Sequence, residues 1–329
     1  MSSQKPHPFL PLELIHYIID FIPLAGDNAK IAYEPSHSIT KTLLSLTRTS
    51  RTIYPKARRL LYTHCLYIDS PWRLQRLLSS LSAYIGDPAG SHPPPNLESE
   101  PSTIQHETSL YLSPFPDDTI NDLHTAQAVK DLLTILAPTL HRLVIDIPLR
   151  SLYPEDDSRG IRRILRDGFV QLTSLEMFCS ARDELFLSCS AEWPTEQSEE
   201  NVWSLWPNLK TLALYNCDLV SAKFWRDIGK IKKLETLILT RADSVQDVDF
   251  KAEWNRGEST HRSWTMWFVD VDGGHGIPET VEEPKEGDKA RVKIERVPTS
   301  YYGDEDVIEL CQDWVKRLVL RHVNVFHRG

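Results

Sequence analysis

LKTLALYNCDL, residues 209–219, is the stretch that decides the fold of this chain. Leu209, Leu212 and Leu214 follow an L-x-x-L-x-L spacing, and Cys217 and Leu219 extend it to eleven residues. We expect a short buried strand here, with the Cys217 side chain capping the turn by which the chain leaves the strand.

The six-residue core of this pattern recurs, so the chain resembles a leucine-rich-repeat protein. The starts of successive copies are 32, 37, 25 and 81 residues apart, and helical stretches lie between several of them. We therefore predict an irregular α/β solenoid; the alternative is that the copies are ordinary buried strands of an α/β sheet. The other copies are LHRLVI (140–145), LTSLEM (172–177), LETLIL (234–239) and VKRLVL (315–320).

The long gap before the last copy holds an insertion at about residues 251–303. WTMWFVDV (264–271) and ARVKIERV (290–297) read as two strands, and the alternation of Val292 and Ile294 with charged residues indicates one solvated face. A Gly-rich and then acidic loop joins them. We predict a β-hairpin, after which a helix over 304–318 returns the chain to the solenoid.

The N-terminus begins with a helix that is apolar on more than one side. In LPLELIHYIIDFI (10–22), Pro11 suits the first helical turn, and only Glu13, His16 and Asp20 are left to face water. A second helix is expected over 40–54 and a third from Pro55. A three-helix unit of this size cannot bury every apolar residue of its first helix, so either the rest of the chain or another protein must cover the surplus.

Residues 9–62 resemble the F-box motif of fungal F-box-like proteins. The first helix matches as Leu10-Pro11-x-Glu13-Leu14-x-x-x-Ile18-x-x-Phe21-Ile22, and Leu43-Leu44-Ser45-Leu46 with Ser50-Arg51 matches the second. Ala57-Arg58-x-Leu60-Leu61-Tyr62 completes the match. The expected fold class is thus mixed α/β, with a three-helix F-box-like head followed by the solenoid and its hairpin.

This resemblance implies a function. F-box helices bind a Skp-type adaptor, which links them to a cullin–RING ubiquitin ligase, while the C-terminal repeats select a protein substrate. Leu43, Leu44 and Leu46 belong either to this surface or to the core of the head. Arg48, Arg51 and Arg58 would lie at its rim against an acidic adaptor, or are a solvated face. The implied adaptor contacts are Leu10, Pro11, Leu14, Ile18, Phe21, Ile22, Leu43, Leu44, Leu46 and Arg51.

The chain departs from the family pattern in two places. The loop over 24–41 is longer than usual, and Thr49–Ile53 lacks the tryptophan that the family commonly has there. An aromatic anchor at an interface contributes about 2 kcal/mol or more, so its loss weakens the expected adaptor affinity. These departures favour a rival hypothesis, a ligase-independent scaffold whose head packs against its own body and covers Leu14 and Ile18.

Charge and composition divide the chain. Residues 1–84 hold ten Lys and Arg against five Asp and Glu, a net of +5, whereas the remainder carries −14 of the total of −9. A basic head suits an acidic protein partner and is too mildly charged to favour nucleic acid. We predict a helical head with its first connecting helix over 1–84, a Pro-rich linker over 85–108, and the repeat body over 109–329.

No motif indicates catalysis, a cofactor or a metal, so the chain is not expected to be an enzyme. Asp270–Gly276, with two acids, a histidine and glycines, is the best local candidate for a ligand site, but a solvated loop explains it better. His322 and His327 near Cys311 lack the paired spacing of a zinc site.

The aromatic and cysteine residues suggest where the protein works. Trp254, Trp264 and Trp267 are candidates for a substrate-recognition patch, although a hairpin packed on the solenoid would bury them. Five scattered cysteines, with no CxxC spacing, indicate reduced thiols of a cytoplasmic or nuclear protein. Neither a signal sequence nor a membrane span is expected.

Overall fold

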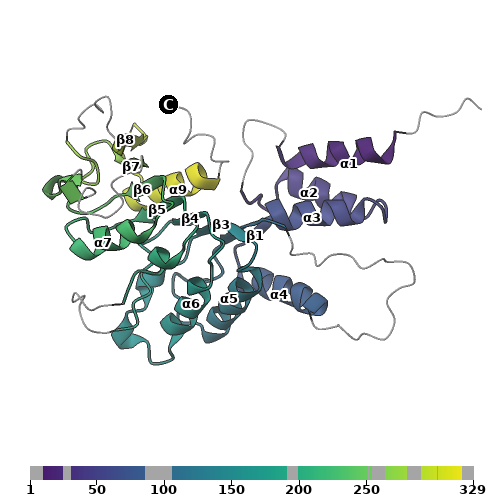
Figure 1. The fold of residues 1–329 in the computed structure, drawn as a ribbon, viewed down its shortest axis with the longest axis horizontal. Coiled ribbons are helices and arrows are strands. Elements are labelled where there is room, and N and C mark those ends of the chain that lie inside the picture. The colour runs from purple at the N-terminus through teal and green to yellow at the C-terminus, as the bar shows by residue number, and fades with distance from the viewer. Residues whose placement is uncertain are drawn as a thin grey trace, which may run out of the picture.

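The computed structural model of the chain describes residues 10–24, 31–85, 106–190, 199–250, 252–253, 264–279, 290–301 and 303–320. Its main feature is one sheet of eight parallel strands that follow one another across the sheet in chain order (Figure 1). The strands are β1 (Leu66–Ile68), β2 (Thr108–Leu112), β3 (Leu140–Ile145), β4 (Met177–Ser180), β5 (Thr211–Tyr215), β6 (Thr236–Thr240), β7 (Trp264–Val271) and β8 (Ala290–Val297).

The register of the sheet aligns the leucines of successive strands. Leu212 on β5 lies beside Leu237 on β6, and Leu214 lies beside Leu239. These four side chains belong to one apolar cluster under the helices that follow the strands. The residues between them on the strands, Ala213 and Ile238, belong to a second cluster on the opposite face. Both faces of the sheet are thus buried, as all-parallel sheets require.

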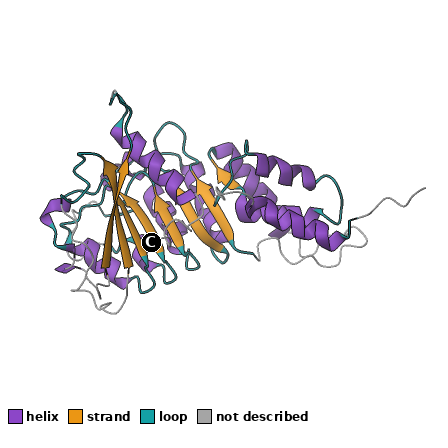
Figure 2. Ribbon diagram, turned by 90° about the horizontal axis from the view of Figure 1, so that it is seen from above, coloured by secondary structure: helices purple, strands orange, loops and turns teal. Residues whose placement is uncertain are grey.

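Helices cover both faces. Residues of α4 to α7 pack in the first cluster, while Cys311, Val315 and Val319 of the C-terminal α9 pack in the second. Figure 2 shows the sheet with helices packed along it and the first three helices beyond one end. The helices are α1 (Leu12–Phe21), α2 (Ser38–Leu46), α3 (Tyr54–His64), α4 (Pro71–Ile85), α5 (Leu123–Leu136), α6 (Ile161–Val170), α7 (Ala222–Lys230) and α9 (Val307–Leu320).

The first three helices, which we call the N-terminal helices, have a small apolar cluster of their own. It is built on one buried side chain from each helix: Ile19, Leu43 and Leu60. α2 ends at Leu46, well before the predicted end at residue 54. The hydroxyl of Thr47 donates to Leu44 O at 2.7 Å and that of Thr49 to Leu46 O at 2.8 Å. These hydroxyls give donors to the carbonyls that the end of a helix leaves without an amide partner.

The predicted fold class is wrong in its architecture. In place of a separate head followed by a repeat solenoid, one all-parallel α/β sheet runs through the chain. β1 follows directly after α3 and pairs with β2, so a strand of the predicted head is part of the sheet. Strands do lie on the copies at 140–145, 209–214 and 234–239, which makes these copies the buried strands of a parallel sheet.

Three further corrections concern two of the repeat copies and the hairpin. The copy at 315–320 is helical, because Cys311, Val315 and Val319 recur every four residues and cover the sheet as part of α9. The copy at 172–177 contributes only Met177 to β4. The predicted hairpin does not exist: β7 and β8 run parallel over eight residue pairs, from Trp264–Ala290 to Val271–Val297. Side-chain alternation identified the strands, but it carries no information on their direction.

Two predicted segments, the linker and the insertion, lie largely outside the described residues. Of the linker over 85–108, the structure describes residue 85 and residues 106–108. Of the insertion over 251–303, it describes mainly β7, β8 and the residues next to them. In the described parts of the chain, no helix combines the length and the hydropathy that crossing a bilayer demands.

Candidate functional site

α1 begins at a proline whose carbonyl starts the helical ladder. Pro11 O accepts hydrogen bonds from Leu14 N at 3.1 Å and from Ile15 N at 3.2 Å. Proline suits this place because the first amides of a helix have no intrahelical acceptor. Only Ile19 of the ten residues in α1 is fully buried. The helix therefore gives most of its apolar surface to solvent.

Four of the exposed large apolar side chains of α1, together with that of Leu10 just before the helix, form the surface that we call the α1 face. Leu14 and Ile18 are four residues apart and lie on one side of the helix, and Leu10 lies just before its N-cap, Pro11. The ring of Phe21 meets that of Tyr17 edge-on, with centroids 4.7 Å apart. All five side chains are between 49% and 61% exposed. The α1 face consists of Leu10, Leu14, Tyr17, Ile18 and Phe21.

The remaining predicted contacts divide between the surface and the core of the N-terminal helices. Leu44 is 48% exposed, whereas its neighbour Leu43 is fully buried. Ile22 and Leu46 are partly buried against the cluster that contains Leu43. Pro11 and Arg51 are exposed. Of the residues predicted to bind the adaptor, Leu43 is thus a core residue. Tyr17, which the prediction missed, could have been found from its position three residues after Leu14 and four before Phe21.

Electrostatic contacts attach the opposite side of α1 to α3. Asp20 accepts hydrogen bonds from Lys56 Nζ at 2.5 Å and from Arg59 at 3.0 Å. The Asp20 side chain is 40% exposed, so each pair adds only about 0–1 kcal/mol to stability. With Ile15 and Ile19 packed inward, these contacts fix which side of α1 is left open.

Positive charge lies on α2 and on the turn after it. Lys41, Arg48 and Arg51 are exposed, and none of them makes an ion pair with another residue that the structure describes. Arg58 does not belong to this group, because it is buried with its guanidinium 5.8 and 5.7 Å from the ring centroids of two tyrosines. The N-terminal helices thus combine an open apolar face with exposed cations, and an apolar surface with acidic residues would complement both features.

The tryptophan candidates for substrate recognition lie in the cores. Trp264 is 3% exposed and packs in the cluster under α4 to α7. Trp267 is 7% exposed and packs in the opposite cluster, with Lys293 Nζ 5.0 Å from its ring centroid. Trp254 lies outside the described residues. No substrate-binding residue follows from these positions.

The loop at 270–276 is held by its own contacts. Asp270 is buried, and its carboxylate accepts hydrogen bonds from Val271 N at 2.8 Å and from Gly276 N at 3.0 Å. A Cβ on Gly274 would lie 2.2 Å from Asp270 Oδ2, and one on Gly276 would lie 2.6 Å from the backbone of Arg241. The glycines are therefore needed for packing. The carboxylate of Asp270 is thus occupied by hydrogen bonds within the fold, and the loop lacks the carboxylate that would best bind a metal or phosphate-associated ligand.

The described residues assemble no metal centre. No three His, Cys, Asp or Glu side chains of this part of the chain come together in a way that could hold a metal. Cys311 is buried, and burial raises the pKa of its thiol to about 12. A hollow of about 530 Å³ lies beside α5 and α6, but its charges are paired, as between Lys130 and Asp167 at 3.2 Å. His322 and His327 lie outside the described residues.

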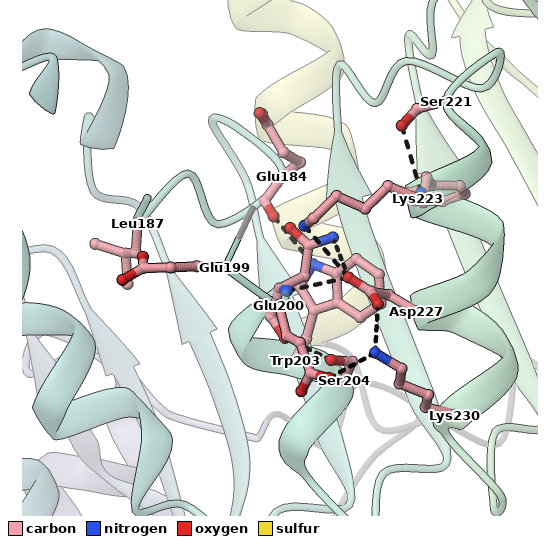
Figure 3. Close-up of polar contacts among 12 residues, drawn as sticks. Glu184, Leu187, Glu199, Glu200, Trp203, Ser204, Ser221, Lys223, Asp227 and Lys230 are labelled. Carbon is pink, nitrogen blue, oxygen red and sulfur yellow. Dashed lines mark hydrogen bonds and ion pairs between the residues drawn. The ribbon is translucent and has the colours of Figure 1, made fainter. Parts of the chain in front are cut away.

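Sequence reasoning missed three buried aspartates, Asp146, Asp183 and Asp227. Asp227 of α7 binds the chain segment just before residue 205 through hydrogen bonds (Figure 3). It accepts hydrogen bonds from Asn201 N at 3.1 Å and from Lys230 Nζ at 2.8 Å. Burial alone would raise the pKa of Asp227, but these donors outweigh it and the pKa is lowered. Asp146 is likewise paired, with Lys316 of α9 at 2.7 Å and Arg182 at 2.6 Å. These contacts join elements of the fold and form no open site.

Compared with models of protein families, with curated proteins and with solved structures, the chain matches none. The resemblance to F-box and leucine-rich-repeat proteins therefore rests on the quoted residues. The α1 face is the strongest candidate for a functional surface, because it is the place where the described structure leaves several large apolar side chains of one helix open to solvent.

Proposed function

We propose that this chain is the substrate-recognition subunit of an SCF-type ubiquitin ligase. The α1 face binds a Skp-type adaptor, and the parallel-sheet part of the chain binds a protein target. The observation that carries the proposal is the exposure of Leu10, Leu14, Ile18 and Phe21 together, since these are the positions at which the motif places adaptor contacts. The chain itself supplies no chemistry in this role.

The energetics of the α1 face suit a protein interface. Full burial of one such side chain is worth about 1.5–3 kcal/mol relative to exposure, and about half of that remains to be gained at each of these half-exposed positions. The four motif anchors and Tyr17 together can thus offset part of the cost of association. Lys41, Arg48 and Arg51 favour an acidic partner and act mainly on the association rate.

The proposed role needs only proximity. A receptor that holds its target beside a charged conjugating enzyme makes the transfer effectively intramolecular. The orientation of the α1 face relative to the target-binding part therefore matters more than any reactive side chain.

A ligase-independent scaffold is the second candidate, favoured by Ile53 at the position of the missing tryptophan. A scaffold whose N-terminal helices pack against the rest of the chain would cover Leu14 and Ile18, but both side chains are at least half exposed. What remains is a scaffold whose α1 face binds a protein other than a Skp-type adaptor.

The test is co-expression of the full chain with a Skp-type adaptor, followed by addition of a cullin. The variant Leu14→Asp/Ile18→Asp should lose the adaptor, while Val220→Asp/Ile308→Asp keeps it. The control pair is matched, because Val220 and Ile308 are 58% and 48% exposed and lie in other parts of the chain. Circular dichroism must show that both variants are folded.

Three outcomes separate the candidates. Co-purification of wild type with adaptor and cullin, lost in the α1 variant alone, supports the ligase subunit. Adaptor binding without recruitment of the cullin contradicts the ligase role. A folded wild-type chain that binds no adaptor contradicts the proposal and favours the scaffold.

A further inference from the structure

The connection between α1 and α2 contains three buried residues in a row. Ile31, Ala32 and Tyr33 are 0%, 1% and 1% exposed, although they belong to neither helix nor strand. Connections normally run over the surface, because a buried one must find partners for its backbone polar groups. This segment lies within the stretch that is longer than the F-box pattern has.

One end of the segment is joined to α9 and the sheet. Ile31 N donates to Leu320 O at 2.7 Å, and Leu320 is the last residue of α9. The bond satisfies one of the carbonyls that a helix leaves without an acceptor at its C-terminal end. The side chains of Ile31 and Ala32 pack in the cluster between α9 and the sheet, which also contains Val144 and Val319.

The other end is joined to the N-terminal helices. Tyr33 N donates to the carbonyl of His64, the last residue of α3, at 2.7 Å. The Tyr33 hydroxyl donates to Pro23 O, directly after α1, at 2.6 Å. Thr40 of α2 donates through its hydroxyl to Glu34 O at 2.8 Å. Tyr33 and its neighbour Glu34 thus contact all three N-terminal helices or the turns beside them.

The N-terminal helices meet the rest of the chain in few places. Their apolar cluster around Ile19, Leu43 and Leu60 is distinct from the two clusters of the sheet. α3 leads into β1, lies against β2 and packs Tyr62 on the cluster under α4 to α7, so this attachment is made through α3. A single such attachment behaves as a hinge, because small rotations at element ends move whole units. A second attachment at another point removes that freedom.

We infer that Ile31–Tyr33 is a strap that fixes the N-terminal helices at one angle to the sheet. It provides the second attachment, with α9 as its anchor. The consequence for a bound adaptor rests on the proposed function: the strap sets the direction in which the adaptor, and the ligase behind it, faces the target-binding part. The long connection then serves to position the α1 face.

The strap can be tested without any partner. Spin labels on unnatural amino acids at Glu13 and Asp131, both exposed, report the distance between α1 and α5 and leave the five cysteines in place. Pulsed electron resonance on wild type should give one narrow distance distribution. Ile31→Ser and Tyr33→Ala should lose the narrow peak and give a broad one, with unchanged far-ultraviolet circular dichroism.

Ile228→Ser is the matched control. Ile228 is also fully buried, but it lies in α7 in the opposite cluster. It should lower stability and keep the narrow distribution. A broad distribution in wild type, or a narrow one in both folded strap variants, would overturn the inference.

Hydrogen exchange covers the case in which the strap variants do not fold. In wild type, the amides of Ile31 and Tyr33 should exchange as slowly as those of the neighbouring strands β1 and β2. Exchange at the rate of an open loop contradicts the strap. Neither measurement involves the adaptor, so failure of the strap leaves the proposed function untouched, and loss of adaptor binding leaves the strap untouched.

Discussion

Replacing Arg162 by methionine should be among the most damaging single substitutions in the protein. Arg162 lies in the first turn of α6 and is fully buried. Its guanidinium donates to the carbonyls of Leu149 at 3.1 Å, Leu152 at 2.5 Å, Phe186 at 2.8 Å and Ser188 at 2.6 Å. Burial lowers its pKa, but an arginine stays charged. One side chain thus supports two connections, those after β3 and after β4.

The expected cost follows from the acceptors left behind. The bonds to Leu149 O and Leu152 O are buried, whereas those to Phe186 O and Ser188 O are partly open and can be replaced by water. A buried acceptor left without a donor costs about 1–3 kcal/mol, so two of them give about 2–6 kcal/mol. Because methionine is uncharged, the variant no longer has the cost of burying a charge. The loss in free energy of unfolding should therefore lie in the lower half of this range.

Arg163→Met is the control. Arg163 is the next residue, is 68% exposed and pairs with Asp167 within the same helix, so its loss should cost about 0.5 kcal/mol or less. Urea unfolding followed by circular dichroism gives both free energies, with equal slopes if unfolding is two-state. Equal free energies for Arg162→Met and Arg163→Met would refute the account of the buried guanidinium.

Three further predictions concern packing and pH. Leu43→Ala should cost about 2–5 kcal/mol in urea unfolding, because Leu43 is fully buried, whereas Leu44→Ala, at a 48% exposed position, should cost far less. Gly274→Ala should lower the melting temperature, since its Cβ would meet the buried carboxylate of Asp270, with a cost of about 1–3 kcal/mol. The buried carboxyl of Asp183 has its pKa raised to about 7, chiefly by burial, so its contribution to the free energy of unfolding should fall between about pH 4 and 7 and level off above pH 7.

The sign for Asp183 comes from the proton count. Between the ordinary pKa of an aspartate and about 7, the folded state holds this proton and the unfolded state has lost it, so rising pH favours unfolding by up to about 1.4 kcal/mol per unit. The Asp183→Asn variant should lack this slope, and the difference between the two curves isolates it. Parallel curves contradict the raised pKa.

The packing assignments have their own refuting results. Leu43→Ala and Leu44→Ala variants with equal free energies of unfolding contradict them, and so does a Gly274→Ala variant with the melting temperature of wild type.

Local features were predictable from the sequence. The spacing of Leu14 and Ile18 predicts a helix, and Pro11 marks where it begins. That the helix has a surplus apolar side also followed, because three short helices offer too little core to cover it, but the sequence left open whether the rest of the chain covers that side. What spacing could not show is that Leu43 points inward and Leu44 outward, since either assignment fits an apolar pair on a helix.

Features that depend on distant residues were not predictable. VKRLVL at 315–320 fits a strand pattern, yet its apolar residues also continue the four-residue spacing of Cys311 and Val315, and packing on the sheet selects the helix. The parallel pairing of β7 with β8 depends on the path of the chain between them, which alternation does not encode. Burial of Arg162 depends on two connections far along the chain, and its sequence neighbourhood reads as an exposed basic helix.

The central claim is that the α1 face binds a Skp-type adaptor, and titration calorimetry of the purified full chain with purified adaptor tests it most directly. Wild type should bind, and Leu14→Asp/Ile18→Asp should bind about 100- to 1,000-fold more weakly, because two interface anchors of about 2 kcal/mol each are lost. The control Val220→Asp/Ile308→Asp should bind as wild type does. Equal affinity of all three proteins, or no binding by folded wild type, would contradict the claim.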